Sequence, residues 1–204
     1  MLETRPGVYF WQAPHPDWEP NDGWDELVTS YALDDGTGLL VIDPLAPPPE
    51  LDVLAAGRTV NVIVTSGWHR RDAEAFAERV GADLYVPPPD ANHPEPGEGT
   101  VYTGGTRPVA GVLAFSGLED SELVLWVEHH GAVIAGDTLI DRGEGLILPQ
   151  DWALSRSGDP VRMRTSLLPL LDLPVEVVLP THGLPTDRAA LERALAEPQV
   201  GAGA

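Results

Sequence analysis

The sequence contains no cysteine and, among its 12 basic residues, no lysine. The lack of cysteine excludes disulfide bonds, thiolate ligands for zinc and cysteine nucleophiles. No segment approaches the run of about 20 apolar residues that a membrane-spanning helix needs. The first residues, Met-Leu-Glu-Thr-Arg-Pro, have no apolar run behind a basic start, so we expect no signal peptide. These absences predict a cytoplasmic protein.

Positive charge is also scarce. Arginine supplies all 12 basic residues against 32 acidic ones, which gives a formal net charge of −20. Binding to nucleic acid requires basic side chains that displace counterions from phosphates, and docking on anionic lipid also requires them. We therefore expect neither nucleic acid nor a membrane as a partner. An acidic, lysine-free composition fits a high-GC genome or a salt-rich cytoplasm, and the sequence leaves both interpretations open.

The chain has 204 residues, of which 43% are hydrophobic, so it is long and apolar enough to bury a core. We predict one domain over residues 1–204, with a long surface loop at 87–105 and a flexible tail at 198–204. Periodicity predicts strands at 7–11, 26–33, 39–42, 60–64, 83–86, 111–115, 123–127, 132–135 and 175–179. It predicts helices at 51–56, 70–80, 161–171 and 187–196. Such an order fits an α/β fold in which helices cover two packed sheets, a four-layer αββα sandwich.

Four short segments contain residues that could build a metal site. They are 65–72 (Thr-Ser-Gly-Trp-His-Arg-Arg-Asp), 115–118 (Phe-Ser-Gly-Leu), 135–138 (Ala-Gly-Asp-Thr) and 179–183 (Leu-Pro-Thr-His-Gly). Their order, spacing and position at predicted strand ends resemble the metallo-β-lactamase fold superfamily. The resemblance implies a sandwich of metallo-β-lactamase type. It also implies two zinc ions bound by His-x-His-x-Asp-His, a further histidine, an aspartate and a final histidine. Such metals generate hydroxide at neutral pH and polarise the bond that it attacks.

The first zinc site of that pattern is degenerate in this sequence. Alignment from Thr65 places Ser66, Trp68 and Leu118 in its three histidine positions. Tryptophan and leucine side chains cannot bind zinc. The alignment therefore predicts that the dinuclear zinc site typical of the family is missing.

At the second zinc site, the same alignment places Arg70 and Arg71 where the family has an aspartate and a histidine. Asp137 and His182 keep the family residues. A buried carboxylate is costly unless it is paired, and the planar fork of a guanidinium matches it well. We therefore favour a site without a metal or other cofactor, in which Arg70 or Arg71 pairs with Asp137. The candidate catalytic residues are Asp137, His182, Arg70 and Arg71.

A loop that is longer by one residue gives a second alignment. His69 then fills the second histidine position, and Asp72 lies where the last ligand of that segment lay. In this alternative, one divalent metal (zinc, iron or manganese) with an open water position is bound by His69, Asp72, Asp137 and His182.

Other side chains suit supporting or binding roles. Asp43 resembles the strand-end aspartate that supports the metal loop in the family. Glu119 and Asp120 follow the third histidine position and could be catalytic carboxylates or a solvated turn. Tryptophans could form the walls of a pocket for an apolar or planar ligand, although core packing explains them equally well: Trp11, Trp18, Trp24, Trp68 and Trp152.

Three functions remain open. We favour a binding or regulatory member of the superfamily that takes a small-molecule ligand, with a homodimer as one assembly it could form. The second is a hydrolase with the single metal described above. The third is a metal-free enzyme in which His182 and Asp137 act as a general acid–base pair and an arginine clamps an oxyanion or phosphate. Either enzyme would act on a small ester, lactone or phosphoester, and fold alone does not decide among these functions.

Overall fold

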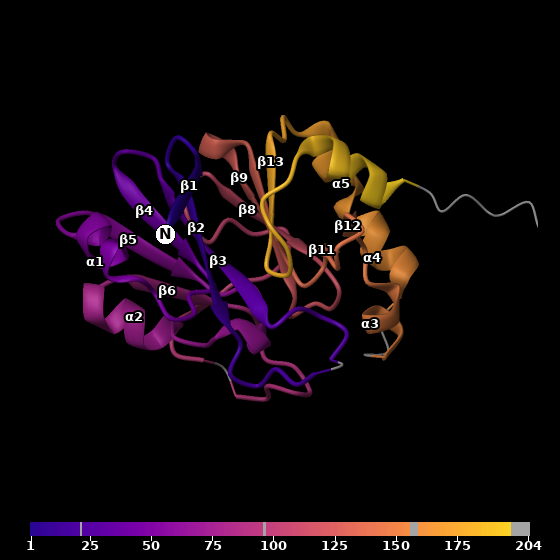
Figure 1. Cartoon of the computed structure of the whole chain (residues 1–204), viewed down its shortest axis with the longest axis horizontal. Helices are drawn as coiled ribbons and strands as arrows, with labels where there is room; N and C mark the ends of the chain where they lie inside the picture. Colours follow the sequence, from indigo (N-terminus) through magenta and orange to yellow (C-terminus); the bar gives the residue numbers. More distant parts are fainter. Residues whose placement is uncertain (21, 96, 156–158, 197–204) are drawn as a thin grey trace, which may run out of the picture.

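Two β-sheets lie face to face in the computed structural model, and helices cover the outer face of each (Figure 1). The structure describes residues 1–20, 22–95, 97–155 and 159–196. The larger sheet has seven strands that lie side by side in chain order. They are β1 (Leu2–Arg5), β2 (Val8–Pro14), β3 (Leu27–Asp34), β4 (Gly38–Ile42), β5 (Thr59–Ile63), β6 (Asp83–Val86) and β7 (Thr100–Val101).

The larger sheet is antiparallel from β1 to β4 and parallel from β4 to β7. The β3–β4 hairpin closes on Asp35, whose Oδ1 accepts hydrogen bonds from the N–H groups of Thr37 and Gly38 at 2.8 and 2.7 Å. Parallel neighbours require crossover connections. Helices α1 (Pro49–Ala55) and α2 (Ala73–Val80) provide those after β4 and β5. The carboxyl ends of β4 and β5 consequently meet at one edge.

The smaller sheet has the strand order β13-β10-β9-β8. Its strands are β8 (Val112–Ser116), β9 (Leu123–Val127), β10 (Ala132–Gly136) and β13 (Val177–Pro180). Strands β8 to β10 form an antiparallel meander, whereas β13 pairs parallel with β10. The connection from β10 to β13 contains the ribbon β11 (Ile140–Asp141) and β12 (Leu146–Ile147), then α3 (Gln150–Ser155), α4 (Pro160–Leu167) and the 3-10 helix η3 (Leu168–Asp172). Because β10 and β13 are parallel, the residues that follow them lie close together.

Side-chain alternation separates the layers of the sandwich. Along β10, Ala132 and Ile134 pack between the sheets, whereas Val133 and Ala135 face the helices on the other side. This is the period of two that a pleated strand imposes. Both faces of the smaller sheet are buried, which explains the continuous apolar run in this strand.

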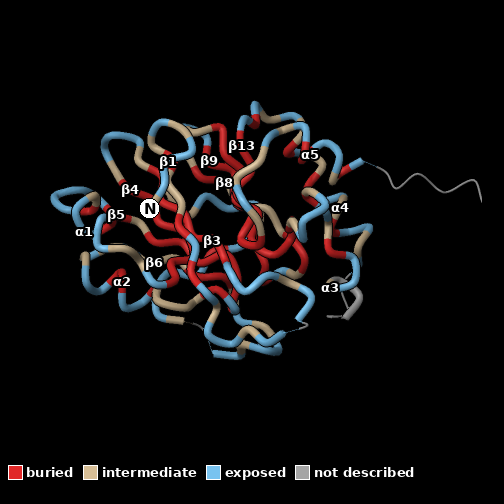
Figure 2. The backbone as a smooth tube through the Cα atoms, viewed as in Figure 1, coloured by how far each residue is buried: buried red, intermediate tan, exposed pale blue. Residues whose placement is uncertain are grey.

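Three apolar clusters fill the spaces between the four layers. One lies between the sheets, a second between the larger sheet and α1 and α2, and a third between the smaller sheet and α4 and α5 (Arg188–Leu195). Figure 2 shows the buried backbone in the interior and exposed residues along the outer helices. The predicted α/β fold with an αββα sandwich is confirmed.

The structure departs from the predicted elements mainly at short ones. Helix α2 begins at Ala73 and not at residue 70, because Gly67–His69 form a 3-10 turn, η1, and Arg71 has a φ of 38°. Strand β1, three two-residue strands and helix α3 were not predicted from the sequence. The two-residue strands are too short to show periodicity, and one of them, β7, lies within the expected loop 87–105. The expected tail 198–204 lies outside the described residues. Within the described part of the chain, no helix is long and apolar enough to cross a membrane.

Candidate functional site

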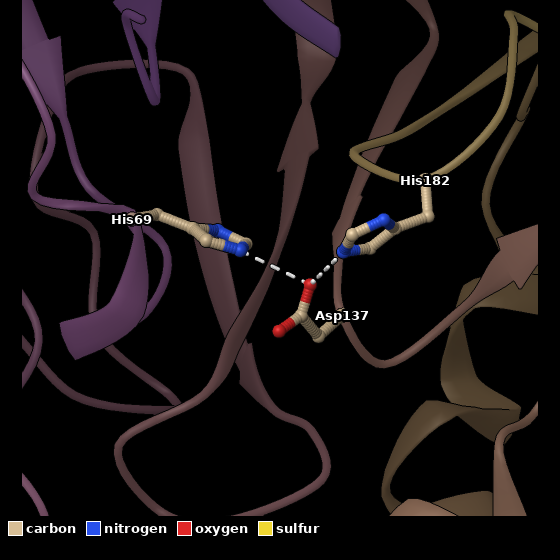
Figure 3. A group of neighbouring side chains, drawn as sticks. All are labelled: His69, Asp137 and His182. Carbon is tan, nitrogen blue, oxygen red and sulfur yellow. Dashed lines mark ion pairs between the residues drawn. The ribbon is translucent and has the colours of Figure 1, made fainter. Parts of the chain in front are cut away.

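Two histidines and an aspartate converge where strands of both sheets end. His69 is the last residue of η1, which follows β5, whereas Asp137 follows β10 and His182 follows β13. The Asp137 Oδ1 atom lies 3.0 Å from His69 Nε2 and 3.3 Å from His182 Nε2 (Figure 3). All three residues are buried. Parallel pairing of β10 with β13 brings Asp137 and His182 together, and the packing of the two sheets adds His69.

Gly136, the last residue of β10, turns the chain before Asp137. Its φ of 53° lies in the left-handed region, where glycine is favoured because it has no Cβ. A Cβ at this position would also lie 3.2 Å from Thr65 Oγ1, which leaves a larger residue little room. Glycine thus allows the close approach of the two sheets on which the cluster depends.

Asp43 fixes the orientation of the His69 ring. Its Oδ1 accepts a hydrogen bond from the Thr65 N–H at 2.8 Å, and its Oδ2 accepts one from the Thr65 hydroxyl at 2.6 Å. His69 Nδ1 lies 3.1 Å from the same Oδ2, so the hydrogen-bond network assigns a proton to this nitrogen. His69 Nε2 is therefore the ring atom that faces Asp137.

Two carboxylates control the titration of His69 in the metal-free protein. Burial lowers the pKa of His69, but Asp137 and Asp43 outweigh burial and the nearby Arg71, and they raise this pKa to about 9. Burial raises the pKa of Asp137, whereas the His69 charge and the hydrogen bonds from both histidines hold it well below its ordinary value. Without a bound cation, His69 is an imidazolium at neutral pH and Asp137 is a carboxylate.

The donor atoms of this cluster fit one divalent metal ion. His69, Asp137 and His182 each offer one ligand atom, and these atoms lie within 4.8 Å of one another. Two imidazoles and a carboxylate suit zinc or iron and leave positions open for water or substrate. A ligating histidine usually donates its other N–H to a carboxylate, as His69 does to Asp43.

The local charge also suits a cation. The Asp43, Asp72 and Asp137 carboxylates all interact with one guanidinium, that of Arg71. With both histidines neutral, these four described groups sum to two negative charges, which a divalent ion balances.

The two consecutive arginines point to different places. Arg70 Nη2 donates to the Glu95 carbonyl oxygen at 2.7 Å, away from the cluster. Arg71 lines the cavity beside the cluster, and its Nη1 lies 3.5 Å from the Asp43 carbonyl oxygen. Asp137 forms ion pairs with His69 and His182. The predicted pairing of an arginine with Asp137 stays a prediction: η1 directs His69 at this carboxylate, and the Arg71 charge also interacts with it.

Asp72 does not join the other three members of the predicted metal set. Its Oδ2 accepts a hydrogen bond from the Ala46 N–H at 2.7 Å, and its own N–H donates to the Pro44 carbonyl at 3.1 Å. These bonds tie the start of α2 to the loop after β4. The structure therefore brings together three of the four residues of the metal alternative.

The three residues aligned with the first zinc site have other contacts. Ser66 Oγ donates to Glu122 Oε1 at 2.6 Å. Leu118 is buried in a small apolar cluster that includes Met163. The Trp68 ring makes an edge contact with His93, with 4.5 Å between the ring centroids. None of these three aligned positions supplies an imidazole.

A cavity of about 680 Å³ opens onto the cluster. Trp24 and Trp152 both pack edge-on against His182, with centroid separations of 5.1 and 5.5 Å. Together with Trp68 they form aromatic walls around the metal candidates. The complete lining among the described residues is His15, Pro16, Asp17, Asp22, Trp24, Leu45, Trp68, His69, Arg71, Asp72, Asp137, Trp152 and His182.

Two polar residues at or near this site were not among the candidates predicted from the sequence. His15 lines the cavity and contacts Trp24, with 5.2 Å between ring centroids. Glu122 is buried beside Ser66. Both occur in loops that resemble solvated turns, and their surroundings come from segments distant in sequence. No local pattern marks them.

No protein-family model and no curated protein matches this sequence. Solved structures match its fold. A metallo-β-lactamase from Erythrobacter litoralis has a TM-score of 0.69 at 14% identity, covering 95% of this chain and 93% of that one. FIM-1 from Pseudomonas aeruginosa, in a mono-zinc form, has a TM-score of 0.66 at 13% identity, with 95% and 91% covered. TTHA1623 in a di-iron-bound form has a TM-score of 0.59 at 23% identity, with 82% and 93% covered. At these identities the likeness shows a shared fold.

Proposed function

We propose that this chain, which has the metallo-β-lactamase fold, is a hydrolase that uses one divalent metal ion bound by His69, Asp137 and His182. The substrate would be a small ester, lactone or phosphoester bound in the tryptophan-walled cavity. The observation that carries the proposal is the convergence of two Nε2 atoms on one carboxylate oxygen, at 3.0 and 3.3 Å. Mono-zinc and di-iron forms of proteins with this fold support the choice of metals.

The chain's own residues have distinct roles in this proposal. His69 and His182 present neutral imidazole nitrogens, and Asp137 presents a carboxylate oxygen. Asp43 holds the Nδ1 proton of His69 and so keeps Nε2 directed at the metal position. When bound, the metal ion would lower the pKa of a water molecule and polarise the scissile bond. The tryptophan walls would orient the substrate and limit the access of bulk water.

We propose one ion and not two, because the positions aligned with the first zinc site lack the required ligands. Ser66 is hydrogen-bonded to Glu122, and Leu118 lies in an apolar cluster. The favoured cofactor is zinc or iron, with manganese as the third metal to test.

Metal uptake tests this proposal. Chelated protein is incubated with Zn²⁺, Fe²⁺ or Mn²⁺ and desalted, then the metal is measured by elemental analysis. We expect one ion per chain in the wild type. In Asp137→Asn and His182→Ala, the affinity for the metal ion should fall by about tenfold or more. Hydrolysis of a panel of small esters, lactones and phosphoesters should depend on the same ion.

Asp72→Asn is the matched control, because it removes a carboxylate next to the site and keeps an oxygen that can accept from Ala46. This variant should bind metal like the wild type. Failure of the wild type to take up any of the three ions would refute the proposal. If Asp72→Asn loses as much metal as Asp137→Asn, Asp72 is a fourth ligand beside the other three.

One observation favours a second candidate, metal-free acid–base catalysis. The Asp43–His69–Asp137 chain holds a buried imidazolium at neutral pH, next to a second histidine. Hydrolysis that survives chelation but is lost in His182→Ala would support this candidate. If neither metal uptake nor turnover is found, a binding or regulatory role becomes the better explanation.

A further inference from the structure

Among the described residues that line the cavity, the residue with a guanidinium group is Arg71. We propose that Arg71 binds a carboxylate group of the substrate, so that the ligand is a small carboxylate with an aromatic or aliphatic body. The inference rests on the proposed function, in which the cavity is a catalytic site. In the family pattern this position is a metal ligand, so the role would be particular to chains with an arginine here.

The backbone at Arg71 is held in a strained conformation. Its φ of 38° lies in the left-handed region, where a residue with a Cβ is disfavoured. Bonds on the following residue fix this turn: Asp72 N–H to Pro44 O at 3.1 Å and Ala46 N–H to Asp72 Oδ2 at 2.7 Å. The turn separates the neighbouring arginines, so that Arg70 reaches Glu95 and Arg71 reaches the cavity. Strain of this kind persists where surrounding contacts impose it, often at functional sites.

The hydrogen-bonding capacity of Arg71 is largely unused by the described residues. A guanidinium has five N–H donors in a planar fork. The Nε atom of Arg71 is buried and has no hydrogen-bond partner within the described part of the chain. Its Nη1 has one long contact, 3.5 Å to the Asp43 carbonyl oxygen. A ligand carboxylate would accept two parallel hydrogen bonds from such a fork.

The rest of the cavity favours a carboxylate over a phosphate. Asp17, Asp22, Asp72 and Asp137 also line the cavity. Their carboxylates repel a dianion more strongly than a monoanion. Trp24, Trp68 and Trp152 offer aromatic surface for a flat or apolar body. The guanidinium of Arg71 beside these aromatic walls therefore matches an arylalkyl carboxylate.

Isothermal titration calorimetry of the metal-free protein tests the inference. The probes are phenylacetate, its neutral counterpart phenylacetamide, and phenyl phosphate. We expect the wild type to bind phenylacetate about tenfold or more tightly than phenylacetamide, since a charge-assisted pair is lost. Arg71→Gln should weaken phenylacetate binding by a similar factor and remove the preference.

Arg70→Gln is the matched control, because it removes the same group from the adjacent residue outside the cavity lining. It should bind like the wild type. The inference is overturned if the wild type shows no preference for phenylacetate or no saturable binding at millimolar concentration. It is also overturned if Arg71→Gln keeps the preference or if phenyl phosphate binds more tightly.

Two further arms keep the outcome interpretable. If Arg71→Gln fails to fold by circular dichroism, Arg71→Lys keeps the charge and loses the fork, and it should weaken phenylacetate binding several-fold. A carboxylate preference in a protein that takes up no metal leaves this inference standing and removes the metal-dependent hydrolase. Metal uptake without a carboxylate preference supports the metal-dependent hydrolase and overturns this inference.

Discussion

At the residue scale, the chemistry of the site depends on what His69 Nε2 holds. Asp43 occupies the Nδ1 side of the ring, so a metal ion and a second proton compete for the same nitrogen. The carboxylates that raise the pKa of His69 to about 9 also make the position attractive to a cation. Metal binding below that pH must therefore release a proton.

This competition predicts how stability depends on pH in the chelated protein. The pKa of His69 rises from 6.5 to about 9 on folding, so its stabilisation is complete below pH 6.5 and is lost as the pH rises through about 9. The shift corresponds to on the order of 3 kcal/mol. Urea denaturation across this interval should show the free energy of unfolding falling by about that amount.

The control variants separate His69 from other titrating groups. His69→Asn should flatten the profile between the two pH values, whereas His129→Asn, at an exposed position, should retain it. A wild-type profile with no decline over this range would contradict the arrangement of charges around His69.

At the element scale, the sandwich depends on apolar faces that anchor each outer helix. Leu191 of α5 is fully buried against the smaller sheet, whereas Leu184, in the preceding loop, is 54% exposed. We expect Leu191→Ala to lower the free energy of unfolding by about 2–5 kcal/mol, because it leaves a cavity. Leu184→Ala should change it by about 0.5 kcal/mol or less. Equal midpoints for the two variants in urea would contradict this packing.

Local sequence predicts the longer strands well, but not the turn that carries His69. Strands such as β3 and β10 were predicted to within one or two residues, because their buried faces require apolar side chains at fixed intervals. The segment that carries His69 was ambiguous. One residue more or less in this loop changes which side chain points inward, and the 3-10 turn and the strained Arg71 that decide it leave no periodic signal.

At the scale of the whole molecule, charge opposes compactness. A net charge of −20 on 204 residues creates self-repulsion that dissolved salt screens. We expect the urea midpoint to rise with NaCl from about 10 to 500 mM, since the Debye length shortens from about 30 to below 10 Å over this range. An unchanged slope of the transition would show that stability, and not the extent of unfolding, had changed. A midpoint independent of salt would contradict the prediction.

Hydrophobic periodicity was enough to predict the layers of this protein, because it encodes which faces are buried. The four spaced segments predicted where the site lies. They also predicted that Asp137 and His182 belong to that site. Three features became clear in the folded chain: His69 completes the cluster, Asp72 anchors a loop, and Arg71 rather than Arg70 lines the cavity. The reason is physical: those positions depend on how a short non-periodic turn is held by contacts from strands far away in the chain.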